Sequence, residues 1–162
     1  MSPKNLFEHS EKSLWYTPNH KGGYVIFNLG CAKDFNTVEL AATICSGWRD
    51  RGAKHIIVSI GDSPDGEWTE VLSETLKDYR KDKAPLPLVT FPLEEMVNSQ
   101  FVKMECTEFY GWSCALQYFN VVKKTGKHNN SDQMMILSFY VVETPMTTPD
   151  YAIPTTAATS ML

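Results

Sequence analysis

The sequence predicts an all-β fold, an antiparallel β-sandwich or barrel. Three observations support this prediction: many short segments are rich in β-branched and aromatic residues, clusters of turn-forming residues separate them, and no segment shows the periodicity of a long helix. An α/β fold would need crossover helices between its strands, and this pattern does not supply them. We therefore expect two facing antiparallel sheets around one hydrophobic core.

The first two predicted strands lie at residues 24–29 and 35–45. The first is rich in β-branched and aromatic residues and ends at Gly30. The second has the two-residue period of a half-buried strand, with apolar side chains on one face at Val38, Leu40, Ala42 and Ile44.

The central part of the chain predicts one buried strand and one ambiguous segment. Residues 53–60 are nearly continuously apolar, as in a strand deep in a sandwich, and the turn-forming sequence GDSPDGEW follows them. Residues 69–80 fit either a short amphipathic helix or a strand running into a turn. Pro85 and Pro87 exclude a helix through the next segment.

Three further strands are predicted at residues 101–109, 115–122 and 133–142. We expect the sandwich to span residues 1–143 and a Pro/Thr/Ala-rich, extended tail to span residues 144–162. The predicted core includes Ile57, Val58, Val102, Met104, Leu116 and Phe119.

Length and charge narrow the functional classes. A chain of 162 residues suits a single domain with a proper core. The net charge is −4 and the basic residues are scattered, which argues against nucleic acid as a partner. The longest apolar run, residues 134–142, is about half the ~20 residues of a membrane-spanning helix. The N-terminus lacks a signal-peptide core, so we expect a cytoplasmic protein if the sequence is full length and an extracellular one if an artificial start replaced an export signal.

The four cysteines leave two interpretations open. No two of them have CxxC spacing, so a zinc knuckle or a thioredoxin-type site is not supported. All four lie in or beside apolar segments, where buried free thiols are the first interpretation and one disulfide is the alternative.

Four sequence motifs in order resemble the discoidin family, also called the coagulation-factor type C or galactose-binding-like domain superfamily. They are LWYTPN at residues 14–19, NLG at 28–30, VSIGDSPDGEWTEVL at 58–72 and FVKMECTEFYGWSCALQYFNV at 101–121. The resemblance covers residues 14–122. It implies an eight-stranded jelly-roll-like sandwich that binds sugars, phospholipid headgroups or partner proteins through loops at one end.

The first candidate site is the segment Trp48, Arg49 and Arg51, where the resemblance places a ligand-contacting loop. A tryptophan ring can stack on the apolar face of a pyranose, and arginine can donate paired hydrogen bonds to hydroxyls or a carboxylate. The alternative is an internal Arg–Asp pair with Asp50 that stiffens the loop. The preceding AATICSG is apolar where similar sugar-binding sequences tend to be polar, which favours that alternative.

Other aromatic residues fall into binding and structural candidates. Tyr110 and Trp112 flank a glycine in a predicted loop, where either a binding or a structural role fits. Tyr16 borders the same end in this kind of fold and could contribute a stacking wall, whereas we expect Trp15 in the core and Trp68 in a structural role. The acidic turn residues Asp62, Asp65 and Glu67 could bind calcium, but solvated turn acids are far commoner, so we expect neither metal nor cofactor.

The sequence therefore predicts a protein that binds rather than catalyses. It has no nucleophile elbow, no HExxH and no phosphate-binding glycine loop. Our first hypothesis is a lectin-like recognition module for a carbohydrate, with ligand contacts from Trp48, Arg49, Arg51, Tyr110 and Trp112. The alternative is a structural subunit of an assembly that docks onto protein partners through its sandwich surface and its C-terminal tail.

Overall fold

A computed structural model describes residues 6–7, 14–18, 22–42, 51–81, 87–125 and 140–142. Within these residues the regular structure is β-sheet, apart from short 3-10 turns such as Tyr79–Lys81. The strands are β1 (Trp15–Tyr16), β2 (Gly23–Ala42), β3 (Arg51–Gly61), β4 (Thr69–Thr75), β5 (Val89–Gly111), β6 (Ala115–Val122) and β7 (Tyr140–Val142). The all-β prediction is confirmed.

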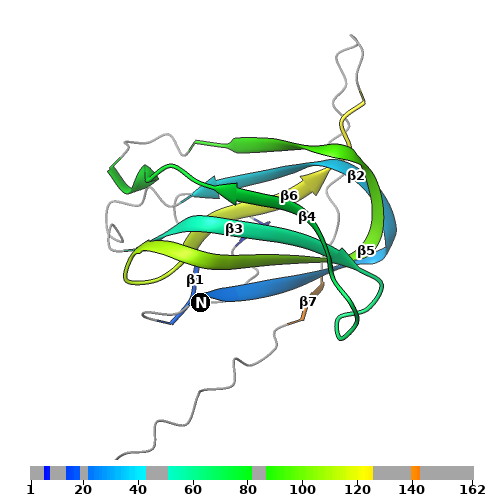
Figure 1. Cartoon of the computed structure of the whole chain (residues 1–162), viewed down its shortest axis with the longest axis horizontal. Helices are drawn as coiled ribbons and strands as arrows, with labels where there is room; N and C mark the ends of the chain where they lie inside the picture. The colour runs from blue at the N-terminus through cyan, green and yellow to red at the C-terminus, as the bar shows by residue number, and fades with distance from the viewer. Residues whose placement is uncertain are drawn as a thin grey trace, which may run out of the picture.

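All strand pairs are antiparallel, in the order β1-β6-β2-β5-β3-β4, with β7 on β2. The long strands β2 and β5 each bend and take part in both layers of a sandwich (Figure 1). The first half of β2 pairs with residues 101–106 of β5, and its second half pairs with residues 89–99. A register shift after Asn28 marks the bend, where Gly30 has a φ of 80° that other residues rarely adopt.

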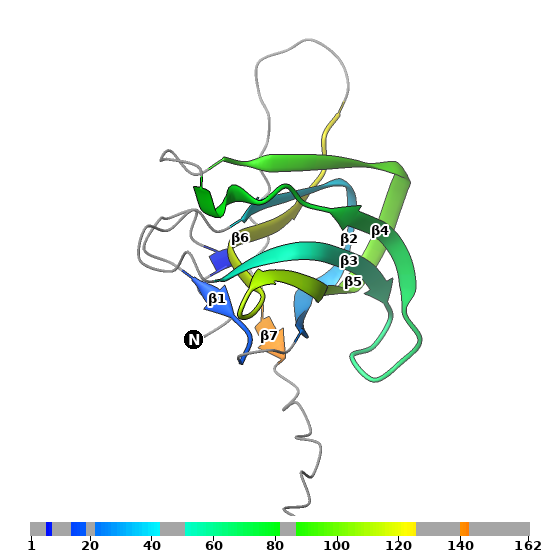
Figure 2. The same ribbon diagram turned by 60° about the vertical axis from the view of Figure 1, so that its left-hand side comes forward.

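The two layers share one hydrophobic core. One layer contains β7, the first half of β2, the second half of β5, β3 and β4; the other contains β1, β6, the second half of β2 and the first half of β5 (Figures 1 and 2). Phe27 of the first layer stacks on Phe119 of the second, with ring centroids 4.9 Å apart. Of the predicted core residues, five are buried as expected: Val58, Val102, Met104, Leu116 and Phe119.

The prediction for Ile57 was wrong. Ile57 is only half-buried, and its neighbour Ile56 is fully buried in the core. The physical reason is the alternation of side chains along a strand. Ile56 and Val58 both face the core, so Ile57 between them faces the other side of β3.

Several predicted segments take a different form in the structure. The strands expected at 24–29 and 35–45 belong to one continuous strand, β2, as far as Ala42. Residues 69–80 form β4 and a 3-10 turn, which decides against the helix. Only residues 140–142 of the segment 133–142 are described, as β7, and the tail 144–162 lies outside the described residues, so the domain boundary stays a prediction.

A disulfide joins Cys106 to Cys114, which corrects the first interpretation of the cysteines as buried free thiols. Cys31 is free but exposed, and Cys45 lies outside the described residues. The sequence could not give the pairing because it depends on how the chain turns between β5 and β6. In the described part of the chain, no helix has the length and apolar character needed to cross a membrane.

Candidate functional site

The turn between β5 and β6 meets the start of β3 at one end of the sandwich, which we call the loop end (left in Figure 1). Arg51, the first residue of β3, pairs with Gly111 and forms a further bridge to Ser113. The amide of Gly52 donates a hydrogen bond of 3.0 Å to the carbonyl of Ser113. These backbone contacts fix residues 111–113 beside Arg51.

The turn that carries Trp112 is braced from several sides. Gly111 has a φ of 76°, which allows the chain to reverse tightly there. The disulfide between Cys106 and Cys114 ties the turn to β5, and the backbone of Cys114 exchanges hydrogen bonds with Thr17 next to β1. The indole of Trp112 nevertheless remains 54% exposed, so a rigid turn presents a large aromatic surface to solvent.

Arg51 lies between the two layers, and its Nε and Nη1 atoms are buried. It shares a face of β3 with the buried Ala53, because side chains alternate along a strand. Its guanidinium carbon lies 4.3 Å from the centroid of the Tyr16 ring of β1, which is a close cation–π contact. This contact connects the two layers and orients the guanidinium at the loop end.

Tyr110 lies on the opposite face of the β3–β5 pair. It pairs with Gly52, and its hydroxyl donates a hydrogen bond of 2.9 Å to the carbonyl of Leu76. The guanidinium of Arg80 lies 5.4 Å from the Tyr110 ring and also donates two hydrogen bonds of 2.8 Å to the Asp78 carboxylate. Tyr110 therefore holds the segment after β4 in place.

The structure brings together some of the predicted site residues and not others. Arg51 and Trp112 meet at the loop end, whereas Trp48 and Arg49 lie outside the described residues. Tyr16 proves to be a direct neighbour of Arg51; its signal in the sequence was the aromatic pair in LWYTPN. Trp15, the other member of the pair, is buried, as predicted.

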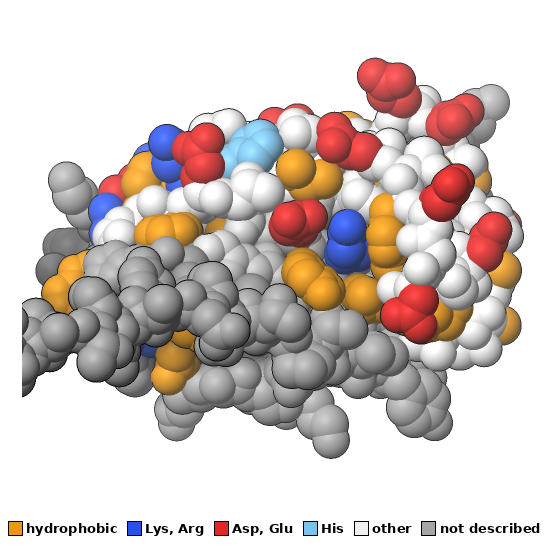
Figure 3. Space-filling view, turned by 60° about the horizontal axis from the view of Figure 1, so that its bottom comes forward, with side chains coloured by type: hydrophobic (Ala, Val, Ile, Leu, Met, Phe, Trp, Pro, Cys, Tyr) orange, Lys and Arg blue, Asp and Glu red, His pale blue; other side chains and the backbone are white. Residues whose placement is uncertain are grey.

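The opposite end of the sandwich, where β2 and β5 bend, carries the acidic turn between β3 and β4. We call it the corner end, and acidic side chains gather over it in Figure 3 (right-hand half). Asp62, Asp65 and Glu67 are all exposed, and among the described residues no group of three His, Cys, Asp or Glu could hold a metal ion. Trp68 packs against Gly61, where an added Cβ would lie 3.2 Å from the indole, in keeping with the structural role predicted for this residue.

Comparisons with solved structures identify the fold. The chain is similar to the CBM32 module of AlyQ in complex with 4,5-unsaturated mannuronic acid, with a TM-score of 0.57 and 21% identity over 74% of this chain and 84% of that one. It is also similar to CpGH89CBM32-5 from Clostridium perfringens in complex with GalNAc-beta-1,3-galactose, with a TM-score of 0.60 and 15% identity over 73% of this chain and 81% of that one. The fold is thus the discoidin-type, galactose-binding-like sandwich that the resemblance implied.

A larger protein shows the same similarity over only part of its length. The match to the Ruminococcus gnavus GH29 fucosidase in complex with fucose has a TM-score of 0.60 and 18% identity, and covers 76% of this chain but 22% of the fucosidase. No family model matches the sequence, and no curated protein matches it.

Proposed function

We propose that this protein is a non-catalytic module that binds a carbohydrate at the loop end, with Trp112 and Arg51 in contact with the sugar. The observation that carries the proposal is the exposed indole of Trp112 on a disulfide-braced turn directly beside Arg51. The similar structures named as carbohydrate-binding modules support it, because two of them hold sugars.

The chemistry of these two side chains suits a sugar. One face of a pyranose is lined by C–H groups and stacks on an aromatic ring, while its hydroxyls accept and donate hydrogen bonds. Trp112 offers the ring. The Nε and Nη1 atoms of Arg51 are buried, so its guanidinium, held against Tyr16, offers a sugar the donors of its remaining nitrogen, Nη2. Because the turn is already fixed, binding costs little additional ordering of the chain.

Two of the other predicted contacts extend this proposal. Trp48 and Arg49 lie three and two positions before Arg51, the first residue of β3, so we infer that they add further stacking and hydrogen-bonding groups next to it. Tyr110 lies on the opposite face of the β3–β5 pair and its hydroxyl is bonded to the Leu76 carbonyl, so we assign it no contact with the sugar.

The test is a binding measurement on Trp112→Ala. A glycan array first selects a sugar that the wild-type protein binds, and titration calorimetry then compares the variants. We expect Trp112→Ala to weaken binding by ~1–3 kcal/mol, the value of one aromatic contact or charge-assisted hydrogen bond, with nearly unchanged stability. Arg51→Ala should weaken it in the same range.

Tyr24→Ala is the matched control, because Tyr24 is also an exposed aromatic residue (39%) but lies on β2, where it pairs with Glu105, and not on the turn that carries Trp112. Its sugar affinity should equal that of the wild type. Equal affinities for Trp112→Ala and the wild type, or an array on which the wild-type protein binds no glycan, would overturn the proposal.

A further inference from the structure

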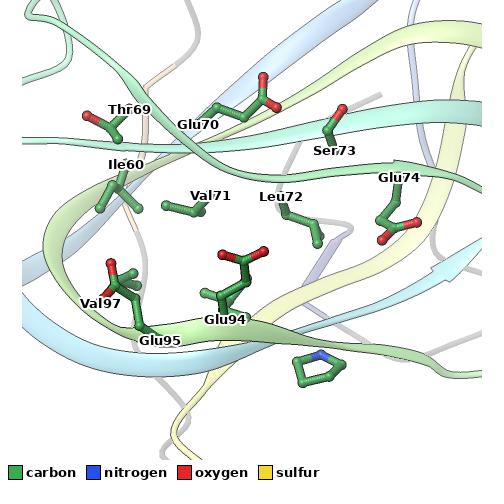
Figure 4. A pocket seen from close by; sticks show the side chains of 12 residues that line it. Ile60, Thr69, Glu70, Val71, Leu72, Ser73, Glu74, Glu94, Glu95 and Val97 are labelled. Carbon is green, nitrogen blue, oxygen red and sulfur yellow. The ribbon is translucent and has the colours of Figure 1, made fainter.

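A groove of about 510 Å³ runs along one side of the sandwich between β4 and the first half of β5 (Figure 4). We call it the side groove. It is lined by residues 69–74 of β4, by residues 92–95 and 97 of β5, and by Ile60 of β3. Neither Arg51 nor Trp112 is among these residues, so the side groove is separate from the proposed sugar site.

Both strands that flank the side groove are sheet edges within the described part of the chain. β4 pairs only with β3, and residues 89–99 of β5 pair only with β2. An edge strand leaves the N–H and C=O groups of alternate residues without a partner strand, and these groups can pair with an added strand. The side groove thus offers backbone hydrogen bonds to an extended chain.

The floor of the side groove is apolar. Val71 and Leu72 of β4 face Leu93 and Val97 of β5, and all four side chains are half-buried. Their remaining exposed surface can be covered by apolar side chains of a bound segment. No aromatic ring lines the side groove, so it lacks the stacking surface that a sugar site uses.

The rim of the side groove is acidic. Glu70 and Glu74 lie on one side and Glu94 and Glu95 on the other, and the lining contains no Lys, Arg or His. Figure 4 shows the carboxylate of Glu94 pointing across the gap toward Val71 and Leu72. None of these four glutamates forms one of the ion pairs found among the described residues.

We propose that the side groove binds an extended segment of a partner protein in which basic and apolar residues alternate. Successive side chains of a strand point to opposite faces, so one set can cover the apolar floor while the other reaches the glutamates. A second copy of this chain would bring the same glutamates and a net charge of −4, so charge complementarity disfavours self-association at this groove. This surface gives the docking alternative of the sequence analysis a defined location.

A fluorescein-labelled, capped octapeptide of alternating lysine and valine tests the proposal by fluorescence anisotropy with the full chain. Two control peptides accompany it: one alternates glutamate with valine, and one carries a proline at its centre, which cannot donate the strand hydrogen bond. We expect the lysine–valine peptide to bind and both controls to bind at least tenfold more weakly. In two-dimensional NMR, its addition should shift the signals of residues 69–74 and 92–97.

Reversing the charge of two glutamates of the side groove tests whether the peptide binds there. The double variant Glu74→Lys/Glu94→Lys should bind the lysine–valine peptide at least tenfold more weakly than the wild type at low salt. The difference should be smaller at high salt, because exposed charges are screened. The matched control is Asp62→Lys/Asp65→Lys, which changes the net charge equally at two exposed positions of the β3–β4 turn, outside the groove lining. Its affinity should stay within about twofold of the wild type, because these exposed charges lie outside the groove lining and are screened by salt.

Three results would overturn the proposal: no binding of the lysine–valine peptide up to about 1 mM, the range of the weakest specific contacts; equal losses in the two charge-reversed proteins; or NMR shifts confined to the loop end. Trp112→Ala should bind the peptide like the wild type. Failure of the sugar proposal would therefore leave this one standing, and the reverse also holds.

Discussion

The loop end and the corner end of the sandwich differ in what their side chains bind. At the corner end, polar groups satisfy one another: the carboxylate of Asp34 accepts hydrogen bonds from Asn98 at 2.7 Å and from Lys123 at 3.0 Å. At the loop end, a disulfide and several backbone hydrogen bonds hold a turn whose largest side chain, Trp112, is mostly left to solvent.

This difference separates two uses of an exposed surface. The paired polar groups around Asp34 stabilise the bend in β2 and are occupied with one another, whereas the acidic residues of the β3–β4 turn at the same end are exposed. The turn at the loop end is held from several sides and still exposes an indole, and this combination is the basis of the sugar-binding proposal. For the proposed sugar site, the number of charged side chains is thus a poorer guide than one exposed aromatic ring on a rigid turn.

The largest effect on stability should come from Leu116→Ala, which should destabilise the loop end and the corner end together. Leu116 is fully buried in β6 and pairs with both Trp15 and Ala42. Truncating it should lower the free energy of unfolding by ~2–5 kcal/mol, through lost burial and the cavity left behind. Ile57→Ala, on the outer face of β3, should cost about 1 kcal/mol or less. Urea unfolding measures both, and equal losses would contradict the assignment of Ile57 to the outer face.

Removing the disulfide should destabilise the loop end and leave the corner end unchanged, which tests the difference between the two ends. Cys106 and Cys114 are 8 positions apart in the sequence. For a closed loop of this size, the double change to alanine should lower the free energy of unfolding by about 2–3 kcal/mol. Sugar affinity should fall, while NMR signals around Asp34 should not move. Cys31→Ala, which removes the exposed free thiol, is the control and should leave both unfolding and binding unchanged.

The smallest effect concerns the corner end and depends on pH. The hydrogen bond from Asn98, followed by that from Lys123, lowers the pKa of the Asp34 carboxyl. A lowered pKa in the folded state stabilises the protein above about pH 4, the ordinary value for Asp, and this contribution is lost as the pH falls through the lowered pKa.

Asn98→Ala should therefore raise the pKa of Asp34 toward its ordinary value, as measured by a carboxylate NMR titration. Asp34 is exposed, so the accompanying change in stability should be small and should decrease further with added salt. An unchanged Asp34 titration in Asn98→Ala would mean that Lys123 alone sets the pKa. The loop end should be unaffected, with the same sugar affinity as the wild type.

Strand positions were predictable from the sequence because alternation of apolar and polar residues is a local property. The bend in β2 was not, because Gly30 has the appearance of a strand end when in fact the chain continues through it with a positive φ. Ile57 was misplaced for a different reason: a continuous apolar run does not show which of its alternating side chains face the core, and here these are Ile56 and Val58.

The candidate site was predictable only in part. Arg51 and Trp112 could be singled out by residue type and by their place between strands, and the structure does bring them together. The face on which Tyr110 lies could not be predicted. Val102, Met104 and Cys106 face the core at every second position, which would also place Tyr110 there. The register shift between Cys106 and Glu108 reverses this alternation. Whether Trp48 and Arg49 join the site stays a prediction.

The sharing of β2 and β5 between both layers also bears on how the chain reaches its native state. Gly23, at the start of β2, pairs with Cys106, near the end of β5, so the central pairing joins segments that are remote in the sequence. Fold topologies dominated by such non-local pairs fold on timescales of milliseconds to seconds, because a long loop must close before its contacts are gained. Neither layer can form without both of these strands, so the two layers should assemble in a single cooperative step.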